Sequence, residues 1–331
     1  MSSTILSFAT KYSIYSGTVI CSLGIVGNVI NILVFTQLKV FRDNRCAFYL
    51  TIESIFNFLY MLFGISVNIL ISIYGDDETG RSLIWCKLRY IIAQTLTSCS
   101  FTMVCCTAAD EYFSTNYRCN LRQTCTLKLA RYLTFILICI WTCHSIIFGY
   151  FSNIMPSIGC TISNENYRQY ATFFFYPVLG GVLPIVISSF FSMLAYRNVR
   201  RIVRRQIPII RRRLDRQITA MVLLRIVVFI CLTVPSIIYH IYAINTPVLR
   251  NTSAQYAIVR LLQIIAFSLL NLNHMSSFYV FIMSSSRFRH QVKYFLIKKC
   301  WKHIRCCHTE NLISPGNAQI FNSNIEHEQN N

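Results

Sequence analysis

Two opposite charges lie inside otherwise apolar stretches that are long enough to cross a lipid bilayer. Glu53 lies about seven residues, roughly 10 Å, from the basic end of its stretch near Cys46, and Arg225 lies about nine residues, roughly 13 Å, from the corresponding end near Arg216. Charges in such surroundings are rare and usually face a helical interior as pairs. We expect a buried ion pair. In the alternative, Arg225 extends to the headgroups and Glu53 is protonated or bonds a hydroxyl such as that of Ser54.

Other polar side chains in or at the ends of these stretches also need partners. Asn28 and Asn57 are amides in hydrocarbon, so both are expected to face the bundle interior. Asp110, Glu111 and Tyr112 end another stretch, next to a basic segment. The stretches hold no His, Cys and Asp cluster at metal or nucleophile spacing, so we expect no catalytic residue, metal or cofactor.

Most of the 15 cysteines lie in apolar stretches or on the basic side of the chain, where thiols stay reduced. Cys86 and Cys160 are the two at loop positions on the other side, which makes them natural disulfide partners. Cys300, Cys306 and Cys307 lie among basic residues after the last stretch, an arrangement typical of palmitoylation. The alternative, a metal site with the neighbouring histidines, lacks a standard zinc spacing.

The composition indicates an all-α membrane protein. Of the 331 residues 54% are hydrophobic and only 13% charged, yet the net charge is +19. Nucleic-acid binding is another common reason for such a charge, but seven apolar stretches of helical-span length argue against it. They predict a seven-transmembrane helix bundle. The stretches cover residues 13–36, 47–74, 87–113, 130–151, 170–196, 217–243 and 256–283.

Basic residues are concentrated on one side of the predicted membrane. They lie in segments 37–46, 114–131 and 197–216 and after residue 284, so the positive-inside rule places the N-terminus outside the cell and the C-terminus in the cytosol. The first stretch is expected to be a retained signal anchor, and Asn251 begins an outer glycosylation sequon. The expected parts are a short extracellular N-terminus (1–12), a seven-transmembrane domain (13–283), a basic amphipathic eighth helix (284–308) and a disordered cytosolic tail (309–331).

In order and spacing, these features resemble the rhodopsin-like G protein-coupled receptors from Ser13 to about Cys307. The resemblance implies a plasma-membrane receptor with an extracellular ligand and with a heterotrimeric G protein or arrestin as its cytosolic partner. It also places Glu53, Arg225 and Val104 in one layer near the bundle centre, where an ion pair would hold the sixth helix inward. The landmarks are Gly27-Asn28-Val29 in the first helix, Cys86 and Cys160 as the family's disulfide, Trp141 in the fourth helix, Pro184 in the fifth, Pro235 in the sixth, and Phe288-Arg289 at the short eighth helix.

Four positions depart from the family's pattern. Glu111 replaces the Arg of the Asp-Arg-Tyr motif, and Thr233 stands where the sixth helix usually has Trp. The Asn-Pro-x-x-Tyr stretch reads Ser277-Phe278-Tyr279-Val280-Phe281. Asn57 replaces the usual Asp, so it is either a weaker sodium ligand or a helix-packing amide. Because a carboxylate cannot make a cation's contacts, the protein is expected to couple differently, weakly or not at all.

The segment 197–216 carries nine Arg residues, and such clusters beside a membrane bind anionic lipids at about 1 kcal/mol per residue. They can also face a G protein or arrestin. The residues expected to face the cytosolic partner are Asp110, Glu111, Tyr112, Arg204, Arg205, Arg211, Arg212, Arg213 and Asp215.

Two classes of receptor, those for light and those for biogenic amines, are excluded because a residue that each class needs is absent. Segment 256–283 has no Lys for a retinal Schiff base, and Ala93 occupies the place of the Asp that amine receptors need. A peptide ligand remains, and Ile84-Trp85-Cys86-Lys87 is similar to invertebrate neuropeptide receptors of the FMRFamide type. Acidic residues 76–78 either steer a cationic peptide or form a solvated loop. The competing functions are a non-coupling scavenger or heteromer partner, which Glu111 favours, and a transporter or channel, which would need repeated halves.

Overall fold

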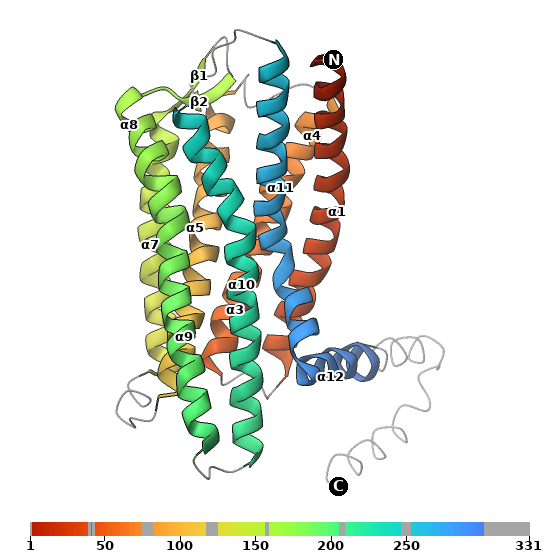
Figure 1. Ribbon diagram of the computed structural model, residues 1–331, viewed down its shortest axis with the longest axis vertical. Coiled ribbons are helices and arrows are strands. Elements are labelled where there is room, and N and C mark those ends of the chain that lie inside the picture. Colours follow the sequence, from red (N-terminus) through yellow and green to blue (C-terminus); the bar gives the residue numbers. More distant parts are fainter. Residues whose placement is uncertain are drawn as a thin grey trace, which may run out of the picture. The chain divides into compact units, whose positions relative to one another are not determined.

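A computed structural model describes residues 2–38, 41, 44–74, 82–116, 125–155, 159–204, 209–245 and 253–300. Seven of its helical segments are long and apolar enough to cross a membrane, which confirms the predicted all-α fold with seven spans (Figure 1). The chain divides into two compact units, one that ends at Ser285 and one that begins at Ser286.

The seven spans form a bundle, and one of them lies at its centre. That central helix, α5, contacts spans on several sides, namely α3, α7, α9 and α10. Helix α11 contacts both α1 and α10 and so closes the bundle. The spans are α1 (Ser2–Gln37); α3 (Arg45–Tyr60) with η1 (Met61–Ile65) and α4 (Ser66–Tyr74); α5 (Leu83–Ser114); α7 (Leu127–Phe151); α8 (Glu165–Gln169) with η3 (Tyr170–Val182) and α9 (Leu183–Arg204); α10 (Ile209–Asn245); and α11 (Ser253–Ser284).

Short polar residues determine where several of these helices begin. The side-chain oxygens of Asn44, Ser82, Thr126 and Asn164 each accept a hydrogen bond from the backbone N–H three residues further along. These N-caps satisfy donors that the first turn of a helix would otherwise leave without partners. They set the starts of α3, α5, α7 and α8.

Three helices extend well beyond the stretches that hydropathy marks. Helix α1 begins at Ser2 rather than near residue 13, because residues 2–12 contain neither Gly nor Pro. Segment 197–216 is largely helical, since α9 continues to Arg204 and α10 begins at Ile209. Hydropathy marks only the apolar part of a helix, which matches the thickness of the bilayer. The helical backbone can continue into polar residues beyond that part.

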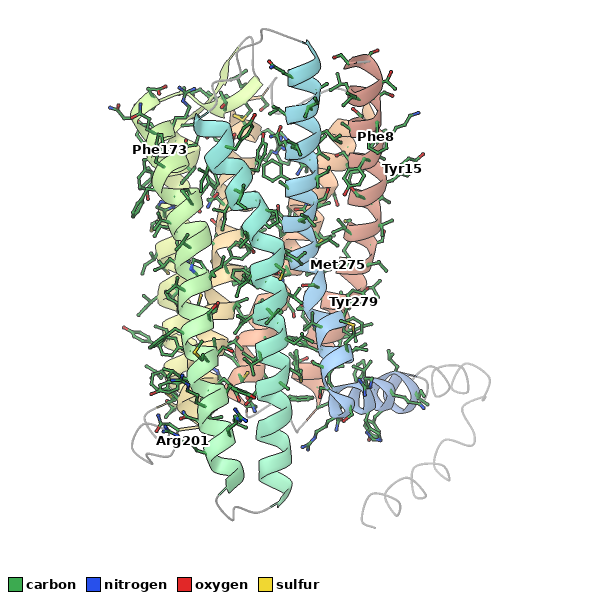
Figure 2. The ribbon with its side chains drawn as sticks, viewed as in Figure 1. Phe8, Tyr15, Phe173, Arg201, Met275 and Tyr279 are labelled. Atoms are coloured by element: carbon green, nitrogen blue, oxygen red, sulfur yellow. A yellow bond between two sulfur atoms is a disulfide. The ribbon has the colours of Figure 1, made fainter. Side chains whose placement is uncertain are left out.

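The outer surface of the bundle is apolar. Phe8, Tyr15 and Phe173 are 58%, 70% and 58% exposed, and their side chains point away from the helices (Figure 2). In water such a surface would be an interaction patch, but on a seven-span protein it faces hydrocarbon. The interior, by contrast, contains many polar side chains, which carry the site described below.

One end of the bundle carries an antiparallel hairpin. Strands β1 (Ser152–Met155) and β2 (Gly159–Ile162) pair so that Ile154 is opposite Cys160. We name this end the hairpin end. Below it, η3 is a π-helical segment that contains Pro177, a residue that removes a backbone donor and disturbs α-helical bonding. Such π segments often occur at functional sites. Residues of η3 line a pocket between the helices, which is described below.

The second unit begins with a short helix. Helix α12 covers Ser286–Tyr294 and continues as η4 (Phe295–Cys300). A short helix after the seventh span is therefore present, and Phe288 lies in its first turn.

Candidate functional site

A disulfide joins the hairpin to the central helix. Cys86 in the first turn of α5 is bonded to Cys160 on β2, with a Cα–Cα distance of 5.7 Å. This confirms the predicted disulfide. Because β2 is bonded to α5, the hairpin cannot move away from the entrance of the bundle without α5.

We expect the Cys86→Ser variant to lose about 2–4 kcal/mol of stability, because the bond closes a long loop that is free in the unfolded chain. Thermal unfolding of purified protein measures this loss. The Cys160→Ser variant and the double variant should unfold at the same temperature as the Cys86→Ser variant. Unequal midpoints would mean that each thiol has a separate role.

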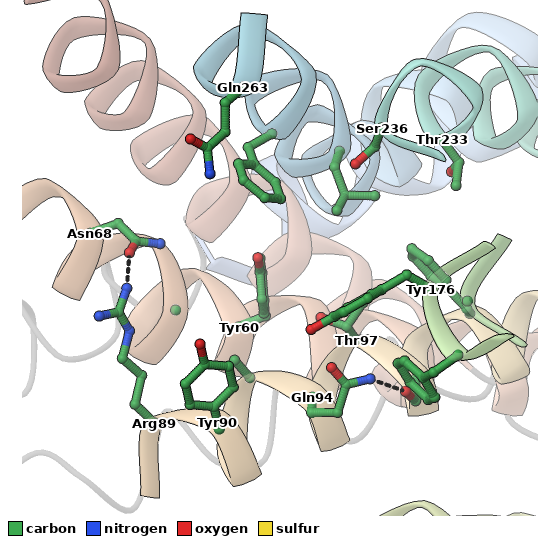
Figure 3. A pocket seen from close by; sticks show the side chains of 18 of the residues that line it. Tyr60, Asn68, Arg89, Tyr90, Gln94, Thr97, Tyr176, Thr233, Ser236 and Gln263 are labelled. Atoms are coloured by element: carbon green, nitrogen blue, oxygen red, sulfur yellow. Dashed lines mark hydrogen bonds between the residues drawn. The ribbon is translucent and has the colours of Figure 1, made fainter. Parts of the chain in front are cut away.

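A pocket of about 570 Å³ opens between the helices below the hairpin. This volume fits a small ligand or the end of a peptide. Figure 3 shows that its polar side chains converge from α3, α5, η3, α10 and α11. The polar side chains that define its walls include Tyr60, Tyr90, Gln94, Tyr176, Ser236 and Gln263.

The predicted ion pair lies deeper in the bundle. Arg225 on α10 donates to Glu53 Oε1 on α3 from Nε at 3.0 Å and from Nη2 at 2.7 Å. The two side chains are only 2% and 1% exposed. Arg225 Nη1 also donates to Asn273 Oδ1 on α11 at 2.6 Å. One guanidinium thus joins three spans, and the ion-pair prediction is confirmed.

A second polar group surrounds Asn57. Its Oδ1 accepts a hydrogen bond from Ser100 Oγ at 2.6 Å and another from His274 Nδ1 at 2.7 Å. Asn28 Nδ2 donates to the backbone oxygen of His274 at 3.1 Å. All four side chains are buried. Both predicted amides therefore face the interior and bond neighbouring spans.

Aromatic contacts connect the pocket to these polar groups. Tyr60 and Phe101 line the pocket and have ring centroids 4.4 Å and 5.6 Å from that of His274. His274 is the chain neighbour of Asn273, which binds Arg225. A continuous series of contacts therefore connects the lower pocket to the ion pair through one helix, α11.

The opposite end of the bundle holds two further carboxylates. Arg45 Nε lies 3.3 Å from Asp110 Oδ1, and Arg45 Nη1 donates to the backbone oxygen of Cys125. Glu111 is buried and accepts a hydrogen bond from Thr219 Oγ1 on α10. Asp110 thus ties α5 to α3, and Glu111 ties α5 to α10.

The sequence of the chain matches the model of one known protein family. Residues 27–293 match the 7 transmembrane receptor (rhodopsin family) model. The chain belongs to the rhodopsin family of seven-transmembrane receptors. No curated protein matches the chain. Proteins of this family are generally not enzymes, and they respond to extracellular ligands through G proteins.

Three landmarks of the receptor lie within the spans. Trp141 Nε1 donates to Thr102 Oγ1 at 2.7 Å and so binds α7 to α5. Pro184 lies on α9, and its backbone oxygen accepts from Ser188 Oγ at 2.7 Å. Pro235 lies inside α10. The ring of Tyr112 packs 5.7 Å from that of Phe191.

The residues around Asn57 do not fit the sodium ion that the family often holds there. A neutral amide replaces the carboxylate, and its oxygen already accepts two hydrogen bonds. The nearest carboxylate along α3, that of Glu53, is paired with Arg225. The guanidinium would repel a second cation. Asn57 has the bonding of a helix-packing amide.

Several predicted residues lie outside the described part of the receptor. These are Arg205, Asn251, Cys306, Cys307 and the acidic residues 76–78. The backbone is described at other sites whose side chains are not, namely Arg204, Arg211, Arg212, Arg213, Asp215 and Cys300.

Sequence reasoning missed three residues of the buried network, namely Ser100 on α5 and two residues on α11. Asn273 and His274 supply the contacts that connect α11 to Arg225 and Asn57. The available signal was a run of polar side chains in an apolar stretch, with Asn271, Asn273 and His274 four residues or fewer apart. Polar residues at that spacing inside a span usually face the interior.

Proposed function

We propose that the receptor binds an extracellular peptide in the pocket at the hairpin end and signals to a heterotrimeric G protein at the opposite end. It would lie in the plasma membrane with its N-terminus outside and its C-terminus in the cytosol. The basic residues beside the opposite end support this orientation. The Cys86–Cys160 disulfide at the hairpin end supports it too, because disulfides persist on the oxidising side.

One observation carries the signalling proposal, namely the continuous contact from the pocket to the ion pair. Tyr60 and Phe101 contact His274, and Asn273 beside it binds Arg225. A ligand that displaces these rings favours the state in which α11 and α10 have shifted. A ligand shifts such an equilibrium only by its difference in affinity for the two states. The ion pair makes the inward state of α10 the favoured one without ligand.

At the cytosolic end we expect partners that recognise a basic surface. The Arg residues at the ends of α9 and α10 would face anionic lipids of the inner leaflet, and also a G protein or arrestin. Palmitoylation of Cys300, Cys306 and Cys307 and glycosylation of Asn251 remain predictions.

A second candidate is a receptor that binds ligand without coupling, as a scavenger or heteromer partner. Glu111 favours it, because a carboxylate occupies the family's Arg position and is bonded inward to Thr219. Such a side chain cannot present a cation to a G protein.

A screen of a peptide library on cells that express the receptor separates the two candidates. Activation of G protein and arrestin biosensors by the same peptides would support the proposal. Uptake of a peptide with arrestin recruitment but no G protein response would support the scavenger. If no peptide produced binding, uptake or signalling, the peptide proposal would be wrong.

A further inference from the structure

Two hydroxyl groups on α10 face the pocket without a hydrogen-bond partner. Thr233 and Ser236 both line the pocket, and Figure 3 shows them on its α10 wall. The two residues are only 2% and 3% exposed. Within the described part of the chain, neither Thr233 Oγ1 nor Ser236 Oγ has a partner. Such a hydroxyl lowers stability, because its hydrogen bonds to water in the unfolded chain are not replaced.

Several other buried hydroxyls are satisfied within the protein. Thr107 Oγ1 and Ser188 Oγ each donate to the backbone oxygen four residues earlier, at 2.8 Å and 2.7 Å. Ser98, another buried hydroxyl of the pocket lining, accepts from Gln94 Nε2 at 3.2 Å. The two α10 hydroxyls make no bond of either kind. Their O–H groups therefore need an acceptor that is not part of the chain.

The two hydroxyls are close enough to bind one group together. Thr233 and Ser236 are three residues apart on α10, a spacing at which Cβ atoms on a helix lie about 5–6 Å apart. An oxygen atom between them would lie within hydrogen-bond distance of both, because each O–H···O bond is about 2.8 Å long. The pair is therefore suited to an acceptor with two lone pairs.

The surroundings of the pair carry no charge. Phe229 precedes Thr233 by one helical turn, and its ring lies 5.0 Å from that of Phe101 in the pocket lining. The charged lining residue Arg89 lies roughly 18 Å from Phe101 along α5. The lining residues that α10 and η3 contribute are all uncharged. An ion bound at this depth would lose its hydration without gaining an adjacent countercharge, which is costly.

We propose that the hydroxyls of Thr233 and Ser236 bind an uncharged carbonyl oxygen of the ligand, next to an apolar group that packs on Phe101. This inference rests on the proposed function for the use of the pocket, and it deepens that function by naming the group that is recognised. A carbonyl oxygen has two lone pairs and can accept from both hydroxyls. Its source in a peptide is either a peptide bond or a terminal carboxamide.

Removal of each hydroxyl tests the proposal on purified full-length receptor. Thr233→Val and Ser236→Ala each delete one oxygen with little change in shape. The probes are phenylacetamide, N-methylphenylacetamide, phenylacetate and isobutylbenzene, a hydrocarbon of similar shape. Thermal unfolding at increasing probe concentration gives each apparent affinity. We expect each variant to bind both amides about fivefold more weakly than the natural receptor, as for the loss of one hydrogen bond, and to bind isobutylbenzene with unchanged affinity.

The unfolding midpoints without probe give a second readout. Because the two hydroxyls have no partner in the protein, Thr233→Val and Ser236→Ala should unfold at the same temperature as the natural receptor or a higher one. The matched controls are Thr107→Val and Ser188→Ala, which delete buried hydroxyls that the protein does bond and that do not line the pocket. The controls should unfold at a lower temperature and keep their affinity for the amides. If one pocket variant does not fold, the other decides the result.

The two amides distinguish the sources of the carbonyl. Similar affinities would identify a peptide bond, whereas binding of phenylacetamide alone would identify a terminal carboxamide. The proposal is overturned if neither pocket variant weakens amide binding, if isobutylbenzene loses as much affinity as the amides, if phenylacetate binds more tightly than both amides, or if neither amide binds. The assay contains no G protein, so amide recognition by a receptor that does not signal would contradict the proposed function alone. Peptide signalling that both variants leave unchanged would contradict this inference alone.

Discussion

The Glu53→Leu variant should lose about 3–5 kcal/mol of stability, and so should Arg225→Leu, because each leaves the other charge buried without its partner. The Glu53→Leu/Arg225→Leu double variant should lose much less, since no charge remains in the core. Midpoints of thermal unfolding in detergent measure these losses. The buried pair is 2% and 1% exposed, so water cannot replace the missing partner.

The chain provides a matched control for this cycle. Arg168 and Glu165 form an exposed pair at the hairpin end, with Nη2 and Oε2 2.5 Å apart. Replacing either or both with Leu should leave the unfolding midpoint nearly unchanged, because exposed pairs contribute little. Equal losses from the single and double variants of the buried pair would show that the two charges do not stabilise one another.

The Glu111→Arg variant should increase nucleotide exchange on a G protein about tenfold, which corresponds to a barrier about 1.4 kcal/mol lower. The substitution removes the acceptor that Thr219 uses on α10 and supplies a cation at the family's contact position. Exchange is measured with reconstituted receptor and purified heterotrimers.

Two further variants separate these causes. Glu111→Gln keeps an oxygen for Thr219 but removes the charge, and Thr219→Val removes the bond but keeps Glu111. If nucleotide exchange rises in Thr219→Val, in which Glu111 is unchanged, the cause is the release of α10 and not a new contact of residue 111 with the G protein. Equal exchange in the natural receptor and in Glu111→Arg would show that the position does not affect coupling.

The sequence predicted those features that depend on whether a residue lies in hydrocarbon, in the protein interior or in water. Hydropathy placed all seven spans, because a helix in hydrocarbon must present a long apolar surface. The cost of buried charge pointed to Glu53 and Arg225, since charges at that depth are rare and usually paired. Cys86 and Cys160 were predicted as disulfide partners because both lie at loop positions on the oxidising side of the membrane.

Features that depend on which helices become neighbours were not predictable in the same way. The bond from Arg225 to Asn273 joins residues that are far apart in the chain, and nothing in the local sequence of either names the other. The pair of Arg45 with Asp110 is of the same kind. The π-helical segments η1 and η3 arise from backbone bonding, which hydropathy does not report. The bonding of Glu111 to α10 also required the fold, because the motif alone indicated only a lost cation.

Nucleotide exchange by the Glu53→Leu/Arg225→Leu double variant, compared with the natural receptor in lipid nanodiscs without ligand, tests the central claim most directly. The claim is that this ion pair holds α10 in the inactive position of a G protein-activating receptor. We expect the double variant to fold and to raise basal exchange several-fold on at least one class of heterotrimer. If every class of heterotrimer exchanged nucleotide no faster with the folded double variant than with the natural receptor, the ion pair would not be the restraint on signalling proposed for it.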